Sequence, residues 1–350
     1  MGAAAGSRNR LMKDVILPML TGNGLVPPLI AFLLLGAVVF VIASRLAQDA
    51  DRIADATGLG RVWIGTLLLA GSTSLPELLT DVNAALLDVP DIGVGDLLGS
   101  TMANLLILAV LDLAFPKRRI LENVAVDHVL VATLALVLTA MAGIAVTVGG
   151  WGSIGHVGIE TLTIAVTYLL GMRVVYRSSA VIVPHAQLAL GEDRHTLLRR
   201  GLTGLAVAAA GLLLTTPLLV ISADAVAIES GLSNTAVGTL LVGFTTSFPE
   251  LAATIAAVRM GALDLAVGNI FGSSAFNMFL LLAMDIAYQP GPLLASVAGT
   301  HGISAQFAIL ALALGILGIL SRAARRTMAV RVESVAILAA YASLAWLLVH

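Results

Sequence analysis

Long apolar stretches separated by short polar ones dominate the sequence. A helix that crosses a bilayer needs about 20 mostly apolar residues, and ten segments meet that requirement if brief polar interruptions are allowed. They lie near 26–44, 62–87, 92–115, 125–148, 155–172, 201–223, 235–258, 263–288, 301–321 and 332–349. The pattern predicts an all-α polytopic membrane protein with ten transmembrane helices, preceded by a short N-terminal tail over residues 1–25.

The composition agrees with a chain that lies in a lipid bilayer. Of its 350 residues, 59 % are hydrophobic and 11 % are charged, whereas soluble domains carry about 25 % charged residues. The mean hydropathy is +1.00. Nineteen basic residues against 21 acidic ones leave no basic field for nucleic acid, and cysteine is absent. These values exclude a cytosolic enzyme and a nucleic-acid-binding protein.

The basic residues also predict an orientation. Sixteen of the 19 lysines and arginines fall in the loops after the first, third, fifth, seventh and ninth segments, and the other three lie in the tail. The positive-inside rule places those five loops in the cytoplasm. We therefore expect a multi-pass protein of the plasma (inner) membrane, with both termini outside and a cytoplasmic linker over residues 173–200.

An internal repeat relates the two halves of the chain. Aligning 65–115 with 238–288 without a gap gives 19 identities in 51 positions, polar residues among them. Matched positions are always 173 residues apart, and this spacing is the repeat offset. Five predicted helices separate the two starts, so the copies enter the membrane from opposite faces. We expect two inverted five-helix repeats, 26–172 and 201–350, an arrangement typical of secondary transporters with a substrate site at the membrane midplane.

Two glutamates stand inside the repeated segments, where a carboxylate costs at least a few kcal/mol. Glu77 and Glu250 each follow a proline, and no basic residue falls inside a predicted span. Pro76 and Pro249 break the helix and free backbone carbonyls. Serine and threonine surround both prolines, so each bend is rich in oxygen atoms, which are the ligands that Ca²⁺ prefers. A relieved helix kink is the alternative explanation for those hydroxyls.

The next helix of each repeat carries a serine and an asparagine on one face. Ser100 and Asn104 are four residues apart, and so are Ser273 and Asn277. Such side chains either contact an ion or form hydrogen bonds between helices without one.

These motifs resemble those of a known family. Gly71-Ser72-Thr73-Ser74-Leu75-Pro76-Glu77 and residues 95–104 are similar to the first alpha-repeat of the sodium/calcium exchangers, prokaryotic type, within the cation/Ca²⁺ antiporter superfamily. Residues 246–250 and 268–277 are similar to the second. The resemblance implies discontinuous helices 2, 3, 7 and 8 around a central ion site, with helices 1 and 6 as a moving gate.

By position, the resemblance also implies roles for individual residues. Glu77 and Glu250 would be the main Ca²⁺ ligands, and Thr73 and Thr246 would add backbone carbonyls. The Na⁺ ligands would be Ser74, Ser100, Ser247 and Ser273, with carbonyls from Ala70 and Gly243, and Asn104 and Asn277 would complete the ring.

Other acidic residues depart from the family pattern. Some exchangers carry aspartate where this chain has Asn277, while Asp96 stands where the second repeat has Asn269. Asp96 is either a third charge of the ion site or a packing acceptor. We expect Asp81 to be solvated, Asp112 to be a cap or a partner for Lys117, and Asp285 to be interfacial.

The sequence therefore predicts a secondary transporter, not an enzyme, that exchanges Ca²⁺ for Na⁺ by alternating access. It would carry Ca²⁺ and Na⁺ without a prosthetic group, and a monomer is sufficient for that mechanism. Alternatives are a Ca²⁺/H⁺ exchanger, a channel, and an intramembrane aspartyl protease, because Gly93-Val94-Gly95-Asp96 reads as Gly-x-Gly-Asp. The protease chemistry needs a second aspartate that shares a proton.

Overall fold

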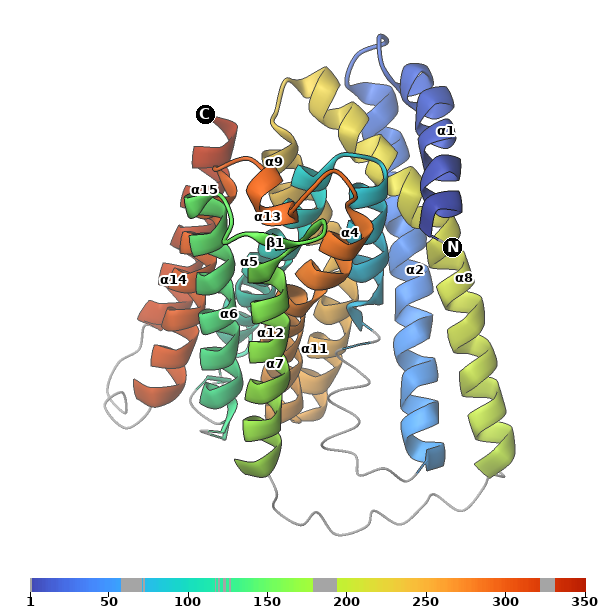
Figure 1. Ribbon diagram of the computed structural model, residues 1–350. Helices are drawn as coiled ribbons and strands as arrows, with labels where there is room; N and C mark the ends of the chain where they lie inside the picture. Colours follow the sequence, from blue (N-terminus) through green and yellow to red (C-terminus); the bar gives the residue numbers. More distant parts are fainter. Residues whose placement is uncertain are drawn as a thin grey trace.

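The computed structural model describes residues 2–57, 71, 73–116, 118, 120–121, 124–125, 127–178, 194–321 and 331–350. They form a bundle of helices with one short antiparallel hairpin (Figure 1). The elements are α1 (Gly2–Leu20), α2 (Val26–Thr57), α4 (Leu75–Leu86), α5 (Pro90–Ala114), α6 (His128–Val148), β1 (Ser153–Ile154), β2 (Val157–Gly158), α7 (Ile159–Ser178), α8 (Arg194–Ser230), α9 (Asn234–Val237), the π-helix η1 (Gly238–Val242), α10 (Gly243–Thr246), α11 (Phe248–Met260), α12 (Leu263–Ala287), α13 (Leu293–Ser296), α14 (His301–Leu320) and α15 (Val332–Val349).

The expected all-α polytopic fold is confirmed. Among the described residues, eight helices are long and apolar enough to cross a membrane, and the bent pair 234–246 and 248–260 adds a ninth span if it is counted as one. These nine match nine of the ten apolar segments of the sequence. The tenth segment, near 62–87, contains α4, and the part before it lies largely outside the described residues.

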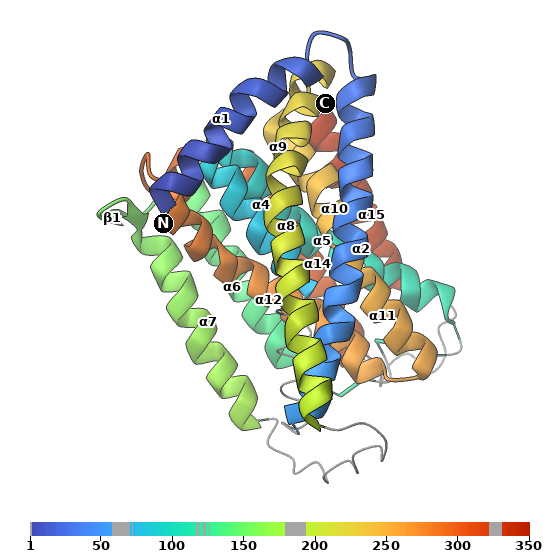
Figure 2. The same ribbon diagram turned by 90° about the vertical axis from the view of Figure 1, so that its right-hand side faces the viewer.

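Two long helices, α2 and α8, stand side by side at the edge of the bundle (Figures 1 and 2). Their apolar contacts, including Phe32 and Val39 of α2 and Leu212 and Leu219 of α8, belong to a cluster that also reaches the start of α5. A second buried cluster joins α5, α6, α7, α12, α14 and α15. The pair α2–α8 therefore packs against the rest of the bundle through an apolar surface of its own.

Contacts between the two halves recur in reciprocal form at the repeat offset. His301 Nε2 lies 2.9 Å from Asp91 Oδ1, and His128 Nε2 lies 3.1 Å from Asp264 Oδ1. The same two carboxylates accept backbone N–H groups at corresponding positions, Ala298 at 2.7 Å and Ala125 at 2.8 Å. Such exchange of partners is what a pseudo-two-fold relation between two copies produces, and it supports the repeat inferred from the sequence.

Asp112 and Asp285 form another matched pair, and each is a structural carboxylate. Each accepts a hydrogen bond from the backbone N–H eight residues later, at 2.9 Å from Ile120 and 2.8 Å from Leu293. Asp285 also accepts from Gly158 and Thr161, and Asp112 from their counterparts at the repeat offset, Arg331 and Ser334. These donors hold Asp285 fully buried within the protein, and its expected position near a membrane surface stays a prediction. The expected partner of Asp112, Lys117, lies outside the described residues.

The seventh span is broken beside its proline. The π-helix η1 and α10 lead to Ser247, after which α11 continues at an angle of 43°. Pro249 occupies the first turn of α11, as Pro76 occupies the first turn of α4. Proline is tolerated there because the first turn has no intrahelical acceptor for its N–H. Both glutamates consequently stand in the first turn of a helix.

Glycine allows the broken span to lie directly against α5. A Cβ atom added at Gly99 would collide with the backbone of Thr239, and one added at Gly95 would come within 3.0 Å of Gly238. The expectation that helices 3 and 8 are discontinuous is wrong, since their counterparts α5 and α12 are single helices of 25 residues. Neither helix contains an interior proline, and the glycines of α5 serve close packing.

Two further segments differ from expectation. The region 1–25, expected as a tail, contains α1, which packs on α4 and α8 (Figure 2). Lys13 pairs with Asp224 at 2.9 Å, and Asn9 donates to Asn83 at 2.6 Å, contacts that a sequence reading of isolated segments does not reveal. Helices α7 and α8 extend into the expected linker 173–200, of which residues 179–193 lie outside the described part of the chain.

We expect Gly99→Ala to weaken the fold. The added methyl group meets the backbone of Thr239, and overpacking of this kind costs about 1–3 kcal/mol. The measurement is the thermal unfolding of the purified protein in detergent, where the variant should melt at a lower temperature. Gly299→Ala is the matched control, since its Cβ has no neighbouring atom within 4 Å. An unchanged melting temperature in Gly99→Ala would contradict the backbone contact.

Candidate cation site

Two glutamates that occupy equivalent positions in the two repeats come together in the middle of the bundle. Glu77 begins α4 and is 1 % exposed, and Glu250 begins α11 and is fully buried. Their carboxyl groups are near enough for their charges to interact. In the described part of the chain, no basic side chain forms an ion pair with either of them. A pair of like charges is thus enclosed without a basic partner, which is costly unless a cation is held there.

Hydroxyl groups from both halves of the chain meet at Glu250. Ser74 and Ser273 donate to its Oε1 atom at 3.3 and 3.2 Å, and the two hydroxyls lie 3.1 Å from each other. Thr73 also hydrogen-bonds to this carboxylate. Because Ser74 and Thr73 belong to the first half, the carboxylate of the second half is held by both halves.

The corresponding hydroxyls on the other side are directed differently. Thr246 donates to Asp96 Oδ1 at 2.7 Å, and Ser100 donates to the same atom at 3.1 Å. The carbonyl oxygen of Gly243 accepts from Ser100 at 3.2 Å and from Ser247 at 2.7 Å. The site is therefore asymmetric in this conformation. Serines satisfy one oxygen of Glu250, while on the other side Ser100 and Thr246 turn to Asp96 and Ser247 turns to the Gly243 carbonyl.

Several buried oxygens, beside the two glutamates or within one helical turn of the site serines, have no hydrogen-bond partner among the described residues. They are Glu77 Oε2, Glu250 Oε2, Asn104 Oδ1, Asn277 Oδ1 and Asp96 Oδ2, and the amide nitrogen of Asn277 is also unpaired. An unsatisfied buried polar group costs about 1–3 kcal/mol, and native proteins carry few of them. The concentration of free oxygens beside two carboxylates indicates a cation site.

The ligands of such an ion would be mixed. No group of three His, Cys, Asp or Glu side chains within the described ranges converges closely enough to hold a metal. One ion would therefore be held by two carboxylates together with hydroxyl, amide and carbonyl oxygens. Ca²⁺ accepts this ligand set, since it takes six to eight oxygens of mixed type.

Most of the residues expected at the site are brought together. Glu77, Glu250, Thr73, Thr246, Ser74, Ser100, Ser247, Ser273, Asn104, Asn277, Asp96 and Gly243 are buried around the centre, while Ala70 lies outside the described residues. Asp96 is an acceptor for two site hydroxyls and also keeps one free oxygen. The sequence analysis missed Asp81, which was expected to be solvated and is fully buried. Its position on the face of Glu77, one turn later, was the available signal.

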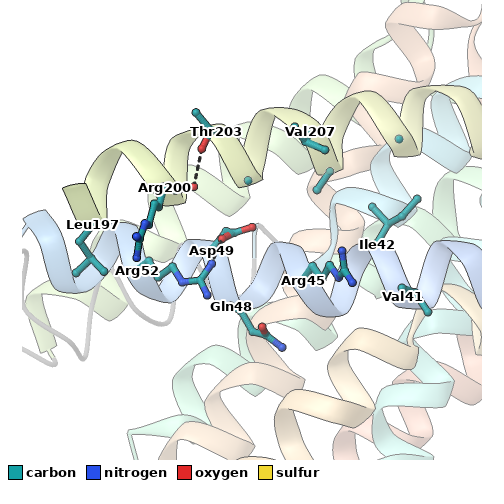
Figure 3. A pocket seen from close by; sticks show the side chains of 13 residues that line it. Val41, Ile42, Arg45, Gln48, Asp49, Arg52, Leu197, Arg200, Thr203 and Val207 are labelled. Atoms are coloured by element: carbon teal, nitrogen blue, oxygen red, sulfur yellow. Dashed lines mark hydrogen bonds and ion pairs between the residues drawn. The ribbon is translucent and has the colours of Figure 1, made fainter. Parts of the chain in front are cut away.

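A large cavity lies elsewhere, between α2 and the first half of α8 (Figure 3). Its volume is about 930 Å³, and Arg45, Arg52 and Arg200 line it together with one acidic residue, Asp49. Asp49 accepts from Arg52 at 2.5 Å. Three guanidinium groups against one carboxylate repel a cation, so this cavity is distinct from the site at the glutamates.

A bundle of membrane-spanning helices, one of them broken beside buried carboxylates, is the architecture of a secondary transporter. The family model described as "Sodium/calcium exchanger protein" matches the chain twice, over residues 27–181 and 200–349. The chain belongs to the sodium/calcium exchanger family, whose members are secondary transporters and not enzymes. The protease alternative fails on this family assignment.

Comparisons with individual proteins agree with this family. An uncharacterized membrane protein of Methanocaldococcus jannaschii, MJ0091, is 29 % identical over 117 residues, which are 33 % of this chain and 38 % of that protein. The match thus spans well under half of the curated relative. A solved structure of the sodium-calcium exchanger NCX_Mj has a TM-score of 0.57 at 21 % identity, covering 89 % of this chain and 95 % of that one. The structure of native YfkE has a TM-score of 0.64 at 18 % identity, covering 95 % and 99 %.

We expect Asn277→Leu to separate ion binding from stability. Both polar atoms of this buried amide lack a partner in the described part of the chain, so its loss should leave the melting temperature of the ion-free protein unchanged or higher. The rise in melting temperature on adding Ca²⁺ should shrink, because a ligand at a hundred times its Kd stabilises a protein by about 2.7 kcal/mol.

Asn83→Leu is the matched control. Asn83 is also buried, but it is bonded to Asn9, to Thr216 and to the carbonyl of Leu79. That variant should melt at a lower temperature and keep the full Ca²⁺-dependent rise. The opposite pattern in the two variants would mean that Asn277 is structural.

Proposed function

We propose that the protein is a cation/Ca²⁺ antiporter that exchanges Ca²⁺ for Na⁺ at the site between Glu77 and Glu250. The observation that carries the proposal is the enclosure of these two carboxylates, one from each half of the chain, without a basic partner among the described residues. The contact of Ser74 with Glu250 supports a site that both halves build together. Membership of the family supports Ca²⁺ and Na⁺ as the transported ions.

Charge balance explains why the two ions would exchange. Two ionised glutamates carry a charge of −2, which one Ca²⁺ or two Na⁺ ions neutralise. The hydroxyl, amide and carbonyl oxygens around the glutamates would serve either ion, so Ca²⁺ and Na⁺ compete for the same atoms. Competition at one site is the simplest basis for antiport.

Neutralisation would also control the conformational change. Moving an uncompensated carboxylate pair through a low-dielectric interior is too costly, so the bundle changes state only when a cation is bound. The pair α2–α8, with its separate apolar contact surface, is suited to move against the rest of the bundle. The internal repeat supplies two related half-structures, and inward-open and outward-open states would exchange their roles.

The orientation belongs to the same proposal. The basic loops would lie in the cytoplasm and both termini outside, by the positive-inside rule. The end of the bundle where α4 ends and α5 begins, which α1 covers, would then face outward. No partner chain is needed for a site that a single chain completes.

The Ca²⁺/H⁺ exchanger remains the rival, and ion flux separates the two. The experiment measures uptake of radiolabelled Ca²⁺ into proteoliposomes under an outward Na⁺ gradient or an outward proton gradient. Uptake should follow the Na⁺ gradient and stay near background with the proton gradient alone. Uptake that follows the proton gradient and ignores Na⁺ would overturn the Na⁺ assignment. Uptake independent of both gradients would indicate a channel.

We expect Glu77→Gln and Glu250→Gln each to reduce Ca²⁺ uptake at least about a hundredfold, since removing one charge of a buried ionic site costs about 3–5 kcal/mol. The amide keeps the shape of the side chain but halves the charge that holds the ion. Uptake and radiolabelled Ca²⁺ binding are measured on the same preparations. Glu229→Gln is the control, because this partly exposed carboxylate accepts from the Gly22 N–H at the end of the bundle, away from the site. Parental uptake in both site variants would end the proposal.

A further inference from the structure

A second pair of carboxylates lies one turn from the glutamates. Asp81 of α4 and Asp96 of α5 are both fully buried, and their carboxyl groups are within hydrogen-bonding reach of each other. Apart from this mutual contact, no group among the described residues donates to either oxygen of Asp81 or to Asp96 Oδ2. Three carboxylate oxygens are thus enclosed together, with a proton shared between the two acids as their one internal donor.

In the second half of the chain, the helices that correspond to α4 and α5 pack together without acidic side chains at these positions. At the repeat offset, Thr254 of α11 corresponds to Asp81, and Asn269 of α12 corresponds to Asp96. Asn269 donates its amide to the Thr254 hydroxyl at 3.3 Å, and both side chains are buried. A neutral hydrogen-bonded pair therefore joins the equivalent helices, so packing alone does not account for two facing carboxylates in the first half.

Unlike the neutral pair Thr254–Asn269, the two carboxylates need a compensating positive charge. Two ionised groups side by side in a low-dielectric interior repel each other and lose their hydration. Within the described ranges, no lysine or arginine pairs with Asp81 or Asp96, and the charge of Glu77 is also near enough to act on both. A positively charged ligand is the element that this arrangement lacks.

The number of free oxygens decides which cation fits. Ca²⁺ takes six to eight oxygen ligands, whereas Asp81 and Asp96 together offer three free oxygens. The remaining oxygen, Asp96 Oδ1, already accepts from Thr246 and Ser100. A pair with so few ligands suits Na⁺ better than Ca²⁺. One Na⁺ together with the proton that the two acids share neutralises their charge of −2.

The pair is continuous with the central site. Asp81 follows Glu77 by four residues on the same face of α4, a rise of about 6 Å. Asp96 is connected to the site through Thr246 and Ser100, which bond to its Oδ1 atom. An ion at the aspartates would therefore be held next to an ion at the glutamates, on the side toward the α4–α5 turn that α1 covers.

From these contacts we propose that Asp81 and Asp96 form a second cation site, which binds Na⁺ and lies in series with the glutamate site. The inference rests on the proposed exchange function and specifies one of its Na⁺ positions. The first half carries acids at 81 and 96, where the second half has Thr254 and Asn269. The two halves then differ in charge, and the Na⁺ stoichiometry depends on that difference.

The test replaces Asp81 by the residue of its counterpart, in the variant Asp81→Thr. Binding of radiolabelled Na⁺ is measured on purified protein without Ca²⁺, with choline replacing Na⁺ in the reference, over a concentration series. The variant should bind about one Na⁺ fewer per chain. Removing one of the two carboxylates should weaken the affinity of this site for Na⁺ about tenfold or more, and a tenfold change in affinity corresponds to about 1.4 kcal/mol. Inhibition of Ca²⁺ binding by Na⁺ should become correspondingly less steep.

Two other variants keep the test decisive. Asp81→Asn preserves the size of the side chain and lets it donate to Asp96, so it should show the same loss of Na⁺ even if Asp81→Thr does not fold. Asp264→Asn removes an acid whose side chain is 64 % exposed and should bind Na⁺ as the parent does. An unchanged number of bound Na⁺ ions in both Asp81 variants would overturn the second site.

Ca²⁺ binding in the absence of Na⁺ distinguishes the two proposals. If the aspartates form a separate Na⁺ site, the Asp81 variants should lose far less Ca²⁺ affinity than Glu250→Gln. An equal loss would place Asp81 in the Ca²⁺ site and overturn the second site. Failure of the glutamate variants to affect Ca²⁺ would instead refute the proposed function, whatever the aspartate variants show.

Discussion

The cost of enclosing negative charge in a lipid-embedded bundle governs this structure. Glu77 and Glu250 are buried near each other, and no basic side chain in the described part of the chain pairs with them. A carboxylate in such a place is tolerated only when a cation compensates it for part of the transport cycle. The hydroxyls around Glu250 and the amide of Asn277 are the groups with which the proposed site would hold and release that cation.

Backbone geometry determines where the carboxylate, hydroxyl and carbonyl oxygens of the proposed cation site lie. Proline at the first turn of α4 and α11 puts each glutamate at a helix start, and the glycines of α5 let η1 and α10 approach until the Gly243 carbonyl reaches Ser100. Away from the site, neutral and charged contacts that hold the frame are matched between the halves, such as those of Asp112 and Asp285. The two halves therefore share the hydrogen bonds that hold their helices together. They differ in the side chains and hydrogen bonds around the place where ions would bind.

Much of this could be anticipated from single residues and their spacing. The internal repeat predicted which polar residues would meet, and Ser74, Ser273 and Glu250 do meet. The predicted breaks in helices 3 and 8 were wrong, since α5 and α12 are continuous and the glycines of α5 permit close packing without ending the helix. The donors that bury Asp285, Gly158 and Leu293, were not anticipated because they come from segments that lie beside it only in the folded chain.

The order of amino acids was enough to establish the membrane class, the positions of nearly all spans, the repeat and the acidic centre, because apolar length, charge and register are local properties of the chain. Three features emerged only on folding: Ser100 and Thr246 turn to Asp96, Asp81 is enclosed beside it, and α1 binds across α4 and α8. Those features depend on which helices face each other and on how closely they approach. Hydrogen bonds and charge interactions between distant segments produce no repeating pattern of residues in a single sequence, so they cannot be predicted from it.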